Sequence, residues 1–272
     1  MTNRRFGSQV LLTAAMIIAL FPIVLMWLTA FKTQAELATN PFGLPQTWHL
    51  DNFVQAWHQG QFSLYLRNSI IVVIPVVGIS LVLSVLAGFA FGAFRFRGQS
   101  ILFLLFLIGI MVPIEGVIVP LYYFLDDLNL INTYWGLILP QVALSTSFGA
   151  FWMRTFFAEV SSDLIDAAAV DGAAMLRTLW SVLLPLAKPA LLTLSVLLFM
   201  WTWNEFLLAL VVTQSAEART LPVGLALFQG RMTAQVPLLA AAATLVSAPI
   251  LAVYVILHRR FIAGLSSGAV KG

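Results

Sequence analysis

Six long apolar stretches, separated by polar segments, dominate the pattern along the chain. A membrane-spanning helix needs about 20 mostly apolar residues, and the six stretches cover residues 10–30, 69–91, 100–124, 136–157, 189–213 and 237–257. The first could be taken for a signal peptide because Arg4 and Arg5 precede it, but it is long, contains Pro22 and lacks a small-residue cleavage site. We therefore expect a retained helix there and six transmembrane helices in total.

The positive charges between the stretches predict the orientation, because Lys and Arg concentrate in cytoplasmic segments. With a cytoplasmic N-terminus, ten of the 14 fall on the inside: Arg4, Arg5, Arg95, Arg97, Arg154, Arg177, Lys188, Arg259, Arg260 and Lys271. The other four, Lys32, Arg67, Arg219 and Arg231, fall outside. The expected fold is all-α and polytopic: one membrane domain over residues 1–272, with both termini cytoplasmic.

Composition supports a membrane protein and excludes some chemistry. Hydrophobic residues make up 61% of the chain and charged residues only 9%, whereas about a quarter of an ordinary soluble domain is charged. There is no cysteine, which excludes disulfides, thiolate metal sites and cysteine nucleophiles. The net charge of +3 is spread over the loops and gives no reason to expect a nucleic-acid partner.

The inner segment 158–188 carries local signals for a helix, a turn and a second helix. Ser161 or Ser162 can cap the first helix, and Asp163 lies in its first turn, where the helix dipole favours an anion. Gly172 can adopt the left-handed conformation that ends a helix, and Pro185 is expected to stop the second arm, 173–184. One interpretation is an amphipathic hairpin that lies on the membrane surface.

The spacing within this loop resembles the signature of binding-protein-dependent ABC permeases: Glu-Ala-Ala, three residues, Gly, nine residues, Ile, any residue, Leu-Pro. Asp166, Ala167, Ala168, Gly172, Val182, Leu184 and Pro185 fall on those positions, with Asp for Glu and Val for Ile. Because Asp is one methylene shorter, the salt bridge made by the family's carboxylate could be altered.

Other pieces, in order along the chain, resemble the carbohydrate-uptake branch of this family, specifically the shorter, maltose-type second permease. They are Arg95-Phe96-Arg97-Gly98, Met111-Val112-Pro113 with Pro120-Leu121, Trp203-Asn204-Glu205-Phe206-Leu207-Leu208, and the ending Gly264-Leu265-Ser266-Ser267-Gly268-Ala269-Val270-Lys271-Gly272. The resemblance implies a subunit in a bacterial inner membrane that translocates a sugar or oligosaccharide. It also implies a homologous second permease, two ATPase subunits and an extracellular solute-binding protein as partners.

By the same resemblance, the loop is the coupling helix pair that docks on the ATPase, and the tail beyond Arg260 lies near that interface. The residues agree with docking, because small alanines allow close approach and the carboxylates of Asp166 and Asp171 can accept hydrogen bonds from Arg or Lys. ATP and Mg²⁺ would bind to the ATPase subunits, and no cofactor is expected in this chain.

Motifs for independent chemistry are missing from the sequence. No Gly-x-x-x-x-Gly-Lys-Ser/Thr phosphate loop occurs. His49, His58 and His258 are scattered, without the His-Glu-x-x-His pair that holds zinc, so we expect no metal site and no enzyme. A polytopic membrane enzyme is therefore the less favoured alternative, and a passive channel would not need the coupling loop.

Two carboxylates fall within the apolar stretches, Glu115 in the third and Glu205 in the fifth, near the expected middle of each helix. A carboxylate in hydrocarbon is costly and indicates function. Helical spacing predicts that Trp201, Asn204 and Glu205 share a face, on which an aromatic ring and polar groups could meet a sugar. The alternative is that they hold helices together.

The proline pattern adds a structural expectation for the substrate path. Pro113 should kink the third helix beside Glu115, as in transporter helices that line a cavity, and Pro22 and Pro75 allow a weaker version of this argument. A glycerol phosphate or oligopeptide permease remains an alternative within transport, although the only Lys or Arg inside a stretch is Arg154, near the inner end of 136–157, and none lies in the middle of a stretch to attract a phosphoester.

Overall fold

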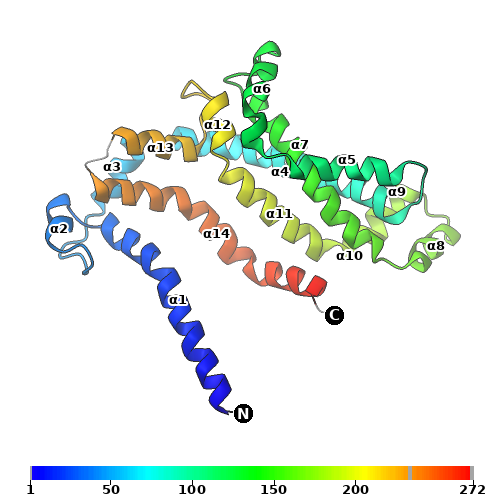
Figure 1. The fold of residues 1–272 in the computed structure, drawn as a ribbon, viewed down its shortest axis with the longest axis horizontal. Helices are drawn as coiled ribbons and strands as arrows, with labels where there is room; N and C mark the ends of the chain where they lie inside the picture. Colours follow the sequence, from blue (N-terminus) through cyan, green and yellow to red (C-terminus); the bar gives the residue numbers. More distant parts are fainter. Residues whose placement is uncertain (1, 232–234, 270–272) are drawn as a thin grey trace. The chain divides into compact units, whose positions relative to one another are not determined.

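The computed structural model describes residues 2–231 and 235–269, and within these residues it contains helices and no strand, which confirms the all-α fold (Figure 1). The long helices are α1 (Thr2–Ala30), α4 (Phe62–Ala93), α5 (Gln99–Met111), α6 (Ile114–Asp127), α7 (Tyr134–Ala158), α11 (Lys188–Trp203), α13 (Leu221–Arg231) and α14 (Val236–Ala269). The short ones are α2 (Gln34–Thr39), α3 (Asp51–Gln59), α8 (Ser162–Val170), α9 (Met175–Thr178), a π-helix (Leu179–Leu183), α10 (Leu184–Leu186) and α12 (Leu207–Val212).

The chain packs as two compact units. The first consists of Met1–Leu64 and Val223–Pro249, and the second of Tyr65–Pro222 and Ile250–Gly272. Three helices, α4, α13 and α14, continue from one unit into the other. A compact unit within a chain need not fold alone, so the single membrane domain over 1–272 stays a prediction.

Four helices are long and apolar enough to cross a membrane: Gly7–Ala30, Phe62–Ala93, Tyr134–Ala158 and Val236–Ile256. They coincide with the first, second, fourth and sixth apolar stretches. Two bent pairs bring the number to six if each counts as one span: Gln99–Met111 with Ile114–Asp127, bent by 97°, and Met175–Leu186 with Lys188–Trp203, bent by 80°. A polytopic protein is thus supported, whereas the count of six stays a prediction.

The third apolar stretch is broken rather than merely kinked. Pro113 has no N–H to donate, and a residue before proline is driven out of the helical region. Val112 accordingly has ψ 114° and separates α5 from α6. The expectation that Glu115 lies near mid-helix is therefore wrong, because it occupies the first turn of α6.

The fifth stretch is also interrupted, between α11 and α12. The side-chain amide of Asn204 donates to the Met200 carbonyl at 2.8 Å, and the Glu205 carboxylate accepts from the Leu208 N–H at 2.8 Å, capping α12. Side-chain bonds of this kind compete with the regular helical ladder. Glu205 therefore lies between two helices and not in the middle of one. The helices that contain Pro22 and Pro75 are continuous.

The core of the second unit holds α4, α7 and α11 together. Small residues four apart on α4 face α7, a pattern typical of close helix contacts in membranes. A Cβ on Gly88 would collide with the Met153 side chain, and a Cβ on Gly92 would lie 2.8 Å from the Phe157 Cβ. Around this contact the buried apolar residues are Val85, Phe89, Met153, Phe157, Leu179, Leu183, Ala187, Leu194 and Leu198.

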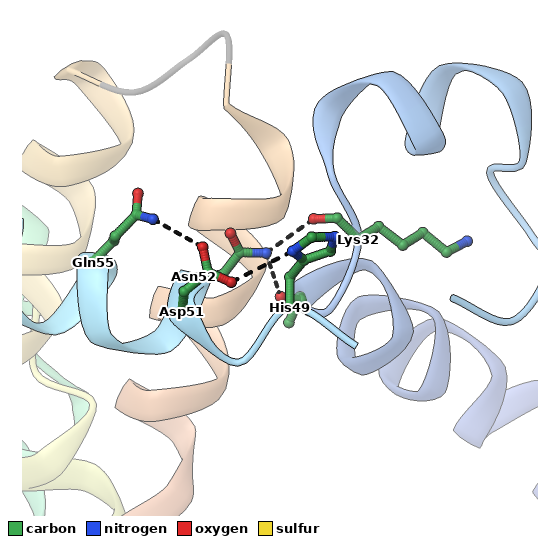
Figure 2. Close-up of polar contacts among 6 residues, drawn as sticks. Lys32, His49, Asp51, Asn52 and Gln55 are labelled. Atoms are coloured by element: carbon green, nitrogen blue, oxygen red, sulfur yellow. Dashed lines mark hydrogen bonds and ion pairs between the residues drawn. The ribbon is translucent and has the colours of Figure 1, made fainter. Parts of the chain in front are cut away.

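In the first unit, the segment after α1 folds back on the end of that helix (Figure 2). The Asn52 amide donates to the carbonyls of Ala30 and Lys32, at 2.9 Å each. The Lys32 side chain is fully buried, and its ammonium donates to the Asn40 carbonyl at 2.6 Å and the Pro41 carbonyl at 3.3 Å. The charge expected on an outer loop is therefore enclosed by backbone.

One of the three histidines pairs with a neighbouring carboxylate in this segment. His49 pairs with Asp51 at 3.5 Å, and Gln55 donates to the same carboxylate at 3.1 Å (Figure 2). Among the inner cations, Lys271 lies outside the described residues, as do Val270 and Gly272 of the expected tail motif.

Candidate functional site

The loop 158–188 forms a helical hairpin with a well-defined turn. The Ser161 hydroxyl accepts from the Asp163 N–H at 3.3 Å and caps α8. At the other end, Gly172 has φ +76°. The N–H of Gly172 donates to the Ala169 carbonyl at 3.0 Å and that of Ala173 to the Ala168 carbonyl at 2.9 Å, which is the Schellman arrangement. The predicted cap and left-handed glycine are confirmed.

The second arm is longer and less regular than predicted. It runs through α9, the π-helix and α10. The π-helix is closed by a bond in which the Leu184 N–H donates to the Leu179 carbonyl, five residues back. The expectation that Pro185 stops this arm at 184 is wrong: Pro185 lies inside α10, where proline is tolerated because the first N–H groups of a helix need no partner there. The chain bends by 80° only before Lys188.

The hairpin presents acidic and apolar groups on its surface. Asp166, Ala167, Asp171 and Gly172 are exposed, whereas Ala168 is buried. Neither Asp166 nor Asp171 forms an ion pair with any described residue. Large apolar side chains flank them, and the most exposed are Val170, Met175, Leu176 and Trp180, between 57% and 88%.

We did not predict from the sequence that these apolar residues contribute to the docking surface. Their position on both sides of the turn at Gly172 would have indicated it. At its base the hairpin is rooted in the second unit, because Leu179 and Leu183 are fully buried in the core with Phe157 and Leu194. A force on the exposed tip would therefore reach α4, α7 and α11. Leu184 is half-buried and Pro185 exposed beside this root.

A cavity of about 290 Å³ lies at the two helix breaks of the second unit. Its walls come from the end of α5, from α7, and from the end of α11 with the interruption that follows. The lining residues are Gly109, Ile110, Val112, Gln141, Leu144, Ser145, Phe148, Trp201, Thr202 and Glu205. The α7 residues lie in the central part of Tyr134–Ala158. The first end of this helix lies beside α12, and the hairpin follows its second end (Figure 1).

The cavity contains two of the four predicted substrate-path residues. Trp201 is 49% exposed, and the Phe148 ring stands nearly perpendicular to it with ring centroids 4.7 Å apart. Glu205 is held by its bond to the Leu208 N–H. Asn204 and Glu115 do not line the cavity, since Asn204 bonds back to Met200 and Glu115 belongs to α6.

The other eight lining residues were not predicted, among them Gln141, Ser145, Phe148 and Thr202. Gln141 and Ser145 lie four apart in the fourth apolar stretch and so share a helix face, which was the available signal. The Gln141 amide donates to the Leu137 carbonyl at 3.1 Å. In the described part of the chain, no group of three or more His, Asp or Glu side chains is placed to hold a metal ion.

Comparison with known proteins identifies the class of protein. Residues 80–267 match the family of binding-protein-dependent transport system inner membrane components, and the chain belongs to this family. The hairpin and the cavity both lie within the matched residues.

Individual relatives cover nearly the whole chain. The diacetylchitobiose uptake system permease protein NgcG of Streptomyces coelicolor is 30% identical, over 99% of this chain and 91% of its own length. The trehalose/maltose transport system permease protein MalG of Thermococcus litoralis is 33% identical, over 94% and 93%. A chain in the crystal structure of a bacterial ABC transporter that imports the acidic polysaccharide alginate superposes with a TM-score of 0.81 at 25% identity, covering 96% of this chain and 98% of that one.

Proposed function

We propose that this chain is the permease subunit of an ATP-driven importer that carries a sugar or oligosaccharide delivered by an extracellular binding protein. The observation that carries the proposal is the hairpin, which has an exposed tip and a root in the core of the membrane helices. The relatives named for diacetylchitobiose and for trehalose/maltose support a carbohydrate substrate. The chain itself is a transporter subunit and not an enzyme.

The hairpin is the docking element for a cytoplasmic ATPase. The exposed apolar groups around Gly172 can fill a groove on a partner, and Asp166 and Asp171 can pair with its Arg or Lys side chains. ATP and Mg²⁺ bind to two ATPase subunits, and a homologous permease completes the pathway. Closure of the ATPases would move the hairpin and, through Leu179 and Leu183, the helices that surround the cavity.

The same assignment sets the topology in the inner membrane. With the hairpin in the cytoplasm, both termini are cytoplasmic, in agreement with the ten to four distribution of Lys and Arg. Trp201 and Glu205 then lie on the translocation path. A glycerol phosphate permease is disfavoured because none of the described residues that line the cavity is Lys or Arg.

The test is ATP hydrolysis by defined assemblies. The purified chain alone should hydrolyse no ATP, and the permease pair with both ATPases should hydrolyse it faster when the binding protein is loaded with sugar. Hydrolysis by the isolated chain, or an assembly whose hydrolysis ignores the loaded binding protein, would contradict the proposal.

A further inference from the structure

The cavity at the helix breaks has an uneven distribution of charge. Among the described residues that line it, Glu205 is the only charged one, and the other polar ones are Gln141, Ser145 and Thr202. Aromatic and aliphatic side chains make up the rest. A substrate that enters this cavity therefore meets one carboxylate, an amide and two hydroxyl groups, with no cation to balance an acid.

Several of these polar atoms are available to a ligand. Elsewhere in the same helices, the hydroxyls of Ser147, Thr155 and Ser195 donate to the carbonyl four residues back. Those of Ser145 and Thr202 make no such bond within the described residues. One oxygen of Glu205 accepts from the Leu208 N–H, which orients the carboxylate, and the described residues supply no donor to the other oxygen.

The apolar wall can hold the face of a sugar ring. Phe148 packs perpendicular to Trp201 and fixes the indole plane, yet leaves the side chain half-exposed. The volume, about 290 Å³, is at the lower end of ligand pockets, which begin at roughly 300 Å³. This size suits one sugar ring rather than a long oligosaccharide.

From this arrangement we infer that the cavity is a binding site for a single uncharged sugar ring and that Glu205 is its specificity-determining residue, excluding uronic acids. The inference rests on the proposed function. The hydroxyls of a neutral ring can donate to the free oxygen of Glu205, whereas a uronate would bring a second carboxylate to the same place with no compensating cation. The chain would then differ in substrate charge from its structural neighbour, whose transporter imports an acidic polysaccharide.

The test uses the permease pair with its ATPases in nanodiscs, without a binding protein, so that the selectivity measured belongs to the membrane subunits. Saturation-transfer NMR is recorded with the methyl glycosides of glucose, galactose and mannose, and with the uronates of the same three rings. Trp201→Ala identifies the signal from this cavity and separates it from any site in the partner permease. Asp127→Asn removes an exposed carboxylate outside both the cavity and the hairpin and serves as the charge control.

The wild-type protein should bind at least one neutral ring through the Trp201-dependent signal, with an affinity at least about tenfold above that for its uronate. Glu205→Gln keeps an oxygen that can accept from the Leu208 N–H but removes the charge. It should therefore reduce the preference for the neutral ring over its uronate to less than about threefold. Asp127→Asn should leave this preference unchanged. Equal binding of both members of a pair by the wild type, or a preference unchanged in Glu205→Gln, overturns the inference.

The outcome also separates the inference from the proposed function. If no ring gives a Trp201-dependent signal, while the complete transporter with its binding protein still accumulates sugar, the cavity is not a sugar site but the importer assignment stands. If the complete transporter moves no sugar, the proposed function itself fails.

Discussion

Replacing Gly172 by valine isolates the contribution of the hairpin turn. A Cβ at this position would meet no atom within 4 Å, so the added Cβ itself causes no steric overlap. The cost that the structure shows is in the backbone, because φ is +76°, a conformation that β-branched residues strongly disfavour. A non-glycine residue held there costs about 1–3 kcal/mol.

That cost can be converted into a population. At tenfold per about 1.4 kcal/mol, the fraction of hairpins in the docking conformation should fall by roughly 5- to 150-fold. Asparagine tolerates the left-handed region better than other non-glycine residues, so Gly172→Asn is the matched control and should retain most docking.

The assay is pull-down of the ATPase with the tagged permease pair, together with uptake of labelled sugar in vesicles. Gly172→Val should insert and pair normally but lose ATPase or uptake, and Gly172→Asn should lose much less of either. Equal, wild-type retention and uptake in both variants would refute the reasoning and leave the hairpin as a surface element of the membrane.

Three further changes have expected outcomes. Asp166→Lys should release the ATPase in the same pull-down, because a like charge at a docked interface costs several kcal/mol; retention would remove Asp166 from the interface. Asn68→Leu deletes donors to the Glu217 and Arg219 carbonyls, both at 2.9 Å, so amide exchange should accelerate in segment 214–220, at a cost of about 1–3 kcal/mol. Lys32→Met should accelerate exchange in segment 33–45 and leave 214–220 unchanged; exchange at the wild-type rate would show that the buried ammonium contributes little.

Local signals in the sequence were sufficient where a conformation depends on near neighbours. The cap at Ser161, the left-handed Gly172 and the break at Pro113 each follow from the chemistry of one or two residues. Pro22 and Pro75 carry the same local signal as Pro113, yet their helices are continuous. Proline alone therefore does not decide between a break and a continuous helix.

Features that depend on distant parts of the chain could not be read in this way. The membership of Gln141 and Ser145 in the cavity depends on how α5, α7 and α11 pack. The interruption around Glu205 is different, because its side-chain bonds join residues only three and four positions apart, and helical spacing alone did not reveal it. The burial of Lys32 requires the chain to fold back so that the carbonyls of Asn40 and Pro41 accept from its ammonium. The π-helix in the second arm of the hairpin had no signal in the sequence that we could identify.

The proposed importer transports sugar only when an ATPase drives it. This can be measured as the concentration of labelled sugar inside proteoliposomes that contain the permease pair and the ATPases, with the sugar-loaded binding protein outside. With ATP on the ATPase side, we expect accumulation above the outside concentration; without ATP, or with Gly172→Val, we expect none. Equilibration of sugar at the same rate with and without ATP would instead indicate a passive channel and overturn the assignment.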